Sequence, residues 1–165
     1  MSHASNGEPA ALNIALLTVS DSRSLAEDRS GDTLVARLEA AGHELAAREI
    51  VTDDRADIAA KLRAWCAEPP IDLVLSTGGT GLTGRDVTVE AHRDVYEKEI
   101  DAFGTVFTMI SMEKIGTSAV QSRATGGAAP GAYRFALPGR PGACQRAGDG
   151  AWEKPPDARP PTRHM

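Results

Sequence analysis

Residues 76–88 read STGGTGLTGRDVT, and this stretch decides both the expected fold and the expected site. It follows a short apolar run and precedes a segment with helical periodicity, so we interpret it as the turn between a strand and a helix. Its glycines allow the backbone to approach an anion closely, and the start of the next helix adds partial positive charge. Gly-rich turns also occur with a purely structural role, so the loop alone does not establish a binding site.

Two well-known phosphate motifs fit this loop poorly. From Gly79 the spacing matches G-x-G-x-x-G, but in dinucleotide-binding folds that pattern follows the first strand and an acidic residue stands about 20 positions later. Here the loop follows the third predicted strand, and the later region, near Phe103, is predicted to be helical. The spacing also matches a P-loop, except that Arg85 and Asp86 replace its Lys and its hydroxyl residue. Because Asp86 would repel phosphate without a cation between them, and Mg²⁺ prefers carboxylate and phosphate oxygens together, we predict a phosphate loop with a metal-binding carboxylate.

The rest of the chain alternates strands and helices around this loop. Short apolar runs predict the strands, and apolar stripes with helical spacing predict the helices. Capping residues mark where two of the helices begin: Ser30 for the first, and Asp53 or Asp54 for the second. The alternation predicts an α/β fold with a largely parallel sheet, in which loops at the carboxyl ends of the strands converge on one pocket. The predicted strands are 13–19, 44–51 and 72–76, with weaker candidates at 119–124 and 133–137 separated by a turn-rich TGGAAPG, and the predicted helices are 30–41, 54–66, 87–95 and 100–110.

Bulk properties exclude several classes of protein. A chain of 165 residues suggests one domain, and its net charge of −5 argues against a broad nucleic-acid surface. No apolar run approaches the roughly 20 residues of a membrane span, and the amino terminus lacks the basic and apolar regions of a signal peptide. The two cysteines, Cys66 and Cys144, form no C-x-x-C pair. We therefore expect a reduced, cytoplasmic protein.

Several spaced motifs together resemble the MoaB/Mog family of molybdenum-cofactor biosynthesis proteins. The resemblance runs from about Asn13 to Cys144, and the Val89 of DVTVEA is more similar to the MoaB branch. The motifs that carry it, in order, are VSDS, DRSGDTL, VTDD, TGGTG-x-x-x-RDVT, QSRATGG and LPGRPGAC.

The resemblance implies a three-layer α/β/α fold with a largely parallel central sheet. It also implies homo-oligomers, trimers or hexamers, and is compatible with contacts to other molybdenum-cofactor biosynthesis proteins. The best-understood members transfer AMP from Mg-ATP to the terminal phosphate of molybdopterin and release pyrophosphate, so Mg²⁺, ATP and molybdopterin are the expected cofactor and substrates.

Site residues are carried over position by position from the family motifs. Asp53 and Asp86 match the magnesium and catalytic positions. The positions that match the pterin- and phosphate-binding segments, together with the neighbouring Arg85, are Ser20, Asp21, Gly78, Gly79, Thr80, Gly81, Arg85, Ser122, Arg123, Pro138 and Gly139.

Some of these residues can instead have purely structural roles, and the protein can have other functions. Asp53 can simply cap a helix, Ser20 and Asp21 can form only a turn, and Arg123 can pair with a surface acid. His92 is expected to be structural or exposed, and the stripe at Phe103 and Phe107 is expected to be core or subunit interface. As alternatives to an adenylyltransferase, the protein can be a non-catalytic molybdopterin carrier or scaffold, or a different nucleotide or phosphosugar binder that shares only the loop.

The two ends of the chain are expected to stand apart from the domain at 13–144. Residues 1–12 are expected to be a flexible segment. The family resemblance implies a closing amphipathic helix after LPGxP, but residues 145–165 are instead interrupted by Gly and Pro and are expected to be disordered. Loss of a covering helix would lower stability or rearrange the oligomer.

Overall fold

The computed structural model describes residues 11–67 and 71–139, with no side-chain description at 66 and 67. The tail at 145–165, most of the segment at 1–12 and the side chain of Cys66 lie outside the described residues. None of the helices within the described ranges is long and apolar enough to cross a membrane.

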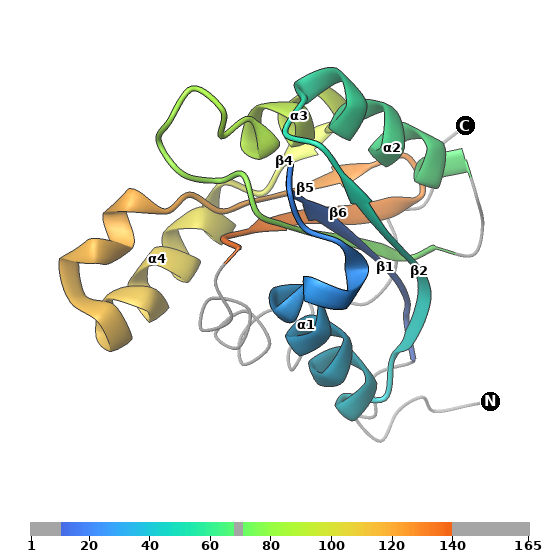
Figure 1. Ribbon diagram of the computed structural model, residues 1–165, viewed down its shortest axis with the longest axis horizontal. Coiled ribbons are helices and arrows are strands. Elements are labelled where there is room, and N and C mark those ends of the chain that lie inside the picture. Colours follow the sequence, from blue (N-terminus) through green and yellow to red (C-terminus); the bar gives the residue numbers. More distant parts are fainter. Residues whose placement is uncertain (1–10, 68–70, 140–165) are drawn as a thin grey trace.

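A six-stranded sheet with the order β2-β1-β3-β6-β5-β4 forms the centre of the molecule (Figure 1). Neighbouring strands among β2, β1, β3 and β6 pair in parallel, whereas β5 pairs antiparallel with both β6 and β4. The inner parallel strands β1, β3 and β6 are almost entirely buried, as expected for a sheet that is covered on both faces, whereas the residues of the edge strand β2 are partly or fully exposed. The strands are β1 (Asn13–Val19), β2 (Glu44–Val51), β3 (Leu73–Thr77), β4 (Lys98–Glu99), β5 (Thr125–Ala129) and β6 (Ala132–Leu137).

Helices cover both faces of the sheet. Helices α1 (Arg29–Ala40) and α4 (Asp101–Ile115) pack on the face that carries Leu16, Leu75 and Phe135. On the other face, α2 (Arg55–Ala67) and α3 (Thr88–Val95) contribute to a second apolar cluster (Figure 1). Two short 3₁₀ helices, η2 (Leu25–Glu27) and η3 (Gly116–Gln121), complete the described chain. The three-layer α/β/α fold is confirmed.

The expectation of a turn at TGGAAPG was wrong, because Thr125–Ala129 forms strand β5. Its glycines are required by close packing rather than by a turn: a Cβ on Gly126 would stand 2.5 Å from Cδ1 of Phe135, and one on Gly127 would stand 2.5 Å from Cδ1 of Tyr96. Only the last residues form the turn, where Gly131 has a φ of +80°. The short β4 was not predicted.

The predicted strand at 119–124 was also wrong, since its first half belongs to the 3₁₀ helix η3 and the rest is not a strand. Gly116 ends α4 with a φ of +68°, and the chain continues as a 3₁₀ helix rather than as a strand. Ala119 is buried but Val120 is 63% exposed, so no second strand pairs with this segment and its apolar residues form no sheet face.

The first N-cap is Asp28 rather than Ser30. Helix α1 begins at Arg29, and Oδ1 of Asp28 accepts a hydrogen bond of 2.9 Å from the backbone N–H of Gly31. Ser30 lies inside the helix and donates its hydroxyl to the carbonyl of Gly139 at 2.6 Å. The second helix is capped as one of the two alternatives predicted, because Oδ1 of Asp54 accepts from the N–H of Asp57 at 2.9 Å.

Candidate phosphate-binding site

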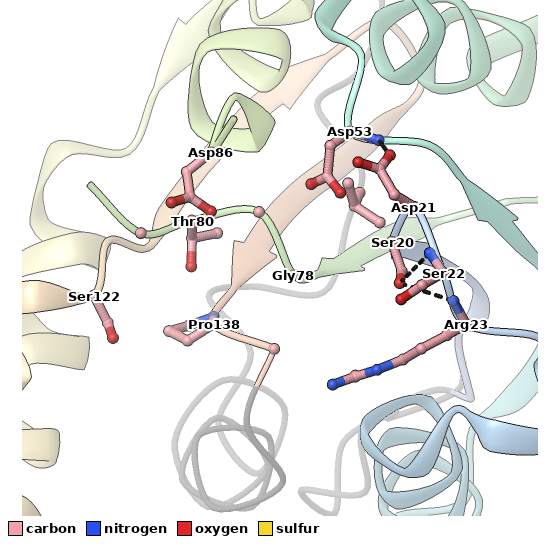
Figure 2. A pocket seen from close by; sticks show the side chains of 14 residues that line it. Ser20, Asp21, Ser22, Arg23, Asp53, Gly78, Thr80, Asp86, Ser122 and Pro138 are labelled. Carbon is pink, nitrogen blue, oxygen red and sulfur yellow. Dashed lines mark hydrogen bonds between the residues drawn. The ribbon is translucent and has the colours of Figure 1, made fainter. Parts of the chain in front are cut away.

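A cleft of about 460 Å³ lies at the carboxyl ends of the parallel strands. The loop after β1, the corner after β2, the glycine loop after β3 and the turn after β6 all reach it, as the parallel topology predicts (Figure 2). The lining residues are Val19, Ser20, Asp21, Ser22, Arg23, Asp53, Gly78, Gly79, Thr80, Gly81, Asp86, Ser122, Pro138 and Gly139.

The glycine loop is fixed between the sheet and α3. The N–H of Gly78 donates to the carbonyl of Leu137 at 3.1 Å, and Oγ1 of the buried Thr88 donates to the carbonyl of Gly78 at 2.7 Å. Gly78 and Gly79 have φ values of +97° and +66°, and a Cβ at Gly78 would stand 2.5 Å from the carbonyl oxygen of Val19. A side chain at either position is therefore excluded, and the backbone itself forms this wall of the cleft.

Asp86 is held in an ionised, ordered position by its own loop. Its Oδ2 accepts hydrogen bonds from the N–H of Thr83 at 3.0 Å and from the Thr83 hydroxyl at 2.7 Å. These bonds, led by the hydroxyl, and a backbone bond from Gly81 lower the pKa of Asp86. A negative charge is thus kept beside the glycine loop before any ligand arrives.

Asp53 approaches the same space from β2. Burial, followed by the negative charge of Asp86, raises the pKa of Asp53. Figure 2 shows both carboxylates beside the glycine loop, Asp86 near Thr80 and Asp53 near Asp21, and both residues line the cleft. The two side chains come from positions 33 apart in sequence and meet only because their strands end at the same edge of the sheet.

The two carboxylates suit a hard divalent cation that arrives with phosphate. Burial, followed by repulsion from Asp86, raises the pKa of Asp53, and a cation between the two carboxylates would relieve the repulsion. The described residues contain no group of three or more His, Cys, Asp or Glu side chains that could hold a metal. One or two carboxylates are the usual protein ligands of Mg²⁺, which completes its coordination with water and substrate phosphates.

Asp21, in the loop after β1, contacts the corner after β2 and the glycine loop after β3. Its Oδ1 accepts from the N–H of Asp53 at 2.8 Å, and its Oδ2 forms an ion pair with Arg85. The side chain of Arg85 is 76% exposed and is not part of the cleft wall. Of these predicted binding residues, Asp21 lines the cleft and braces it, whereas Arg85 is placed outside it.

Arg123 supports the glycine loop from behind. Its N–H and Nε–H donate to the carbonyls of Thr80 and Gly81 at 3.0 and 3.1 Å, and its guanidinium pairs with Glu90 of α3. A further bond of 3.1 Å reaches the carbonyl of Asp86. Arg123 does not line the cleft. This geometry favours the structural role for Arg123 that the sequence also allowed, which is pairing with an acid. The acid is Glu90 of α3, and the pair helps to hold the glycine loop in place.

The remaining predicted residues line the cleft as expected. Ser122 stands at the end of η3, and Pro138 and Gly139 follow β6 (Figure 2). Sequence reasoning missed Ser22 and Arg23, which also line it. Their position directly after Ser20 and Asp21 was the available signal, because a loop at the end of a central strand presents several consecutive residues.

Comparison with known proteins supplies the family. The family described as "Probable molybdopterin binding domain" matches residues 15–152. "Molybdenum cofactor biosynthesis protein B" of Escherichia coli (strain K12) is 44% identical over 140 residues, which cover 85% of this chain and 80% of that protein. The protein of the same name from Bacillus subtilis (strain 168) is 41% identical over 140 residues, covering 84% of this chain and 82% of its own length.

Solved structures agree with these relatives. A crystal structure of Molybdenum cofactor biosynthesis protein B superposes with a TM-score of 0.84 at 40% identity, covering 87% of this chain and 89% of that chain. The tungsten cofactor synthesizing protein MoaB from Pyrococcus furiosus gives a TM-score of 0.76 at 33% identity, covering 86% and 90%.

Proposed function

The chain belongs to the molybdopterin-binding MoaB/Mog family, closer to its MoaB branch, and from this membership we propose that it takes part in molybdenum-cofactor biosynthesis by adenylylating molybdopterin. The reaction joins the terminal phosphate of molybdopterin to the AMP moiety of Mg-ATP and releases pyrophosphate. Binding of the pterin follows the family description, and adenylyl transfer is the further step of the proposal.

The observation that carries adenylyl transfer is the pair of carboxylates at the glycine loop. Asp53 and Asp86 line one cleft beside a glycine backbone that carries no side chain. A protein that only carried a pterin would have little use for two carboxylates in one cleft, where burial and the charge of Asp86 together raise the pKa of Asp53. Two carboxylates beside a phosphate loop instead suit a reaction in which two phosphate groups must approach each other.

The chemistry needs positioning and charge compensation rather than a strong base. An ionised oxygen of the pterin phosphate attacks the α-phosphorus of ATP, the bond from that phosphorus to the bridging oxygen of the β-phosphate breaks, and pyrophosphate leaves with the electron pair. The nucleophile carries no proton that must be removed. Holding both groups in line in the cleft supplies much of the rate enhancement, because a bimolecular encounter becomes unimolecular.

Asp53 and Asp86 would hold Mg²⁺ in this proposal. The ion, when bound, offsets the negative charge that builds up between the phosphates. The protein's own contribution is to keep Asp86 ionised through Thr83 and to hold the corner at Asp53 through Asp21. Thr80 and Ser122 offer hydroxyl groups at the cleft wall for phosphate or pterin oxygens.

The test follows the α-phosphate of ATP. Purified protein is incubated with molybdopterin, Mg²⁺ and ATP labelled at the α-phosphorus, and the pterin product is isolated. We expect label on the pterin with the wild-type protein and none with Asp86→Asn. Asp54→Asn is the matched control, because Asn also caps α2 and Asp54 does not line the cleft.

The outcomes separate the candidate functions. Unlabelled pterin, with pterin bound by well-folded wild-type protein, contradicts adenylyl transfer and assigns a carrier or scaffold. Failure to bind pterin, with retained binding of another nucleotide or phosphosugar, assigns a different ligand to the same loop. Label transfer that survives in Asp86→Asn within a few-fold contradicts the metal role of that residue.

Helix α4 supports the further proposal of a homo-oligomer, as trimer or hexamer. The helix buries Phe107 and Ser111 against the sheet, yet Val106, Met109 and Met112 on its other side are 51%, 63% and 44% exposed. A helix that is apolar on all sides is normally buried on all sides. The same apolar surface on a second copy of the chain would cover it.

A further inference from the structure

We propose that Arg23 binds the phosphate oxygens of a substrate in this cleft. The inference rests on the proposed function for the identity of the substrate and extends it by a binding residue that the family motifs did not supply. Arg23 lines the cleft, and Figure 2 shows its side chain extending from the loop after β1 along the side of the cleft where Pro138 lies.

The backbone at Arg23 is held by the residue that begins the loop. Oγ of Ser20 accepts hydrogen bonds from the N–H of Ser22 at 3.3 Å and from the N–H of Arg23 at 3.2 Å. Such a turn fixes the backbone position from which the Arg23 side chain extends. The role of Ser20 as a turn residue, weighed from the sequence, thereby serves the site by placing Arg23.

The other two arginines near the glycine loop are already committed. Arg85 pairs with Asp21, and Arg123 pairs with Glu90 and with backbone carbonyls behind the loop. Neither lines the cleft. Within the described ranges, the guanidinium of Arg23 makes no hydrogen bond or ion pair, and no other cationic side chain is part of the cleft wall. A free guanidinium there is available for a ligand.

The charges in the cleft favour such a group. With Asp21 paired to Arg85, Asp53 and Asp86 remain, and a divalent cation would neutralise both. The substrates carry several further negative charges on their phosphates, and the guanidinium of Arg23 is the cationic group that would pair with them. Its planar fork of donors matches phosphate oxygens in pairs, which a single ammonium group does not.

The experiment measures equilibrium affinities by titration calorimetry for wild-type protein and for Arg23→Ala. The ligands are molybdopterin, Mg-ATP and inorganic pyrophosphate, with adenosine and dephosphorylated pterin as phosphate-free probes. We expect Arg23→Ala to weaken pyrophosphate and at least one phosphate-bearing substrate by about tenfold or more, with Arg23→Lys recovering part of the loss. The substrate that loses affinity identifies which phosphate the guanidinium holds.

The matched control is Lys98→Ala, which also removes one positive charge from an exposed side chain that lies on β4 and outside the cleft. Affinities for all phosphate ligands within twofold of wild type in Arg23→Ala would overturn the inference, and so would an equal loss for the phosphate-free probes. If pyrophosphate binding depends on Arg23 but the wild-type protein transfers no label to the pterin, the inference about Arg23 stands and the proposed adenylyl transfer is contradicted. Wild-type protein that binds no phosphate ligand would overturn both.

Discussion

At the scale of single residues, the site depends on two carboxylates with opposite pKa shifts. Thr83 and the backbone of the glycine loop lower the pKa of Asp86, whereas burial and the charge of Asp86 raise the pKa of Asp53. Groups that would repel each other are kept together at the point where phosphate is expected, so some folding stability is given up for function. A ligand that brings a divalent cation would recover it.

The pKa of Asp53 should report this coupling directly. Asp86→Asn removes the repulsion and leaves the burial, so the pKa of Asp53 should fall but stay above its ordinary value. Carbon-13 NMR titration of the Asp53 carboxyl measures it, with Asp94→Asn as a control because Asp94 pairs with Arg55 and does not line the cleft. An unchanged pKa in Asp86→Asn would mean that the two carboxylates do not interact.

The same shift fixes the sign of a pH effect on stability. A carboxyl whose pKa is raised on folding lowers the free energy of unfolding. This destabilisation is complete above the raised folded pKa, and it disappears as the pH falls through the folded pKa toward the unfolded pKa. Wild-type protein should therefore be less stable than Asp53→Asn at pH 7, and the gap should narrow as acid is added across that window. Urea unfolding at a series of pH values measures the gap, and a gap that widens with acid would contradict the assignment.

At the scale of elements, the glycines of β5 show why a strand resembled a turn. Gly126 and Gly127 lie against the rings of Phe135 and Tyr96, and a β-carbon at either position would stand 2.5 Å from a ring atom. The apolar pattern that predicts strands is absent because aromatic side chains from elsewhere fill the space. In contrast β1 and β3, with continuous apolar residues, were predicted within one residue of their observed bounds.

Gly126→Ala should therefore destabilise the protein by about 1–3 kcal/mol through overpacking. Gly84→Ala is the matched control, because a Cβ there meets nothing within 4 Å and its backbone is not left-handed. The free energy of unfolding in urea distinguishes them. Equal effects of the two substitutions would show that the contact with Phe135 does not restrict β5.

The start of α1 depends on the fully buried Asp28. Its carboxylate caps the helix at Gly31 and also accepts hydrogen bonds from Thr18 and Arg48. Asp28→Ala should cost about 2–4 kcal/mol, because it removes a cap and leaves a partly buried guanidinium without this partner. Asp32→Ala removes a 60%-exposed partner of the same Arg48 and should cost about 1 kcal/mol or less. Similar losses in thermal or urea unfolding would contradict this ranking.

At the scale of the whole molecule, the parallel topology explains what could be predicted of the site. Asp21, Asp53 and Gly78 follow three different strands, and the rule that ligands bind at the carboxyl ends of strands brought them together without coordinates. Arginine orientations could not be predicted in the same way. Their long side chains are set by tertiary partners, Asp21 for Arg85 and Glu90 for Arg123, and no local pattern specifies those pairs.

The apolar surface of α4 predicts assembly. Met109→Glu places a charge in the middle of that surface, so it should shift the protein toward a monomer if copies associate there. Leu25→Glu is the control, because Leu25 is 49% exposed on η2, outside that surface. Light scattering after size-exclusion chromatography gives the mass of each variant. A wild-type monomer, or an oligomer unaffected by Met109→Glu, would contradict this role for α4.

The most direct test of the central claim is the release of pyrophosphate from Mg-ATP in the presence of molybdopterin. We predict release that needs both substrates and falls at least about 100-fold, or about 2.7 kcal/mol, in Asp53→Asn and in Asp86→Asn but not in Asp54→Asn. Release within a few-fold of wild type in both cleft variants would contradict the assignment of the paired carboxylates. Wild-type protein that binds molybdopterin yet releases no pyrophosphate would contradict adenylyl transfer itself.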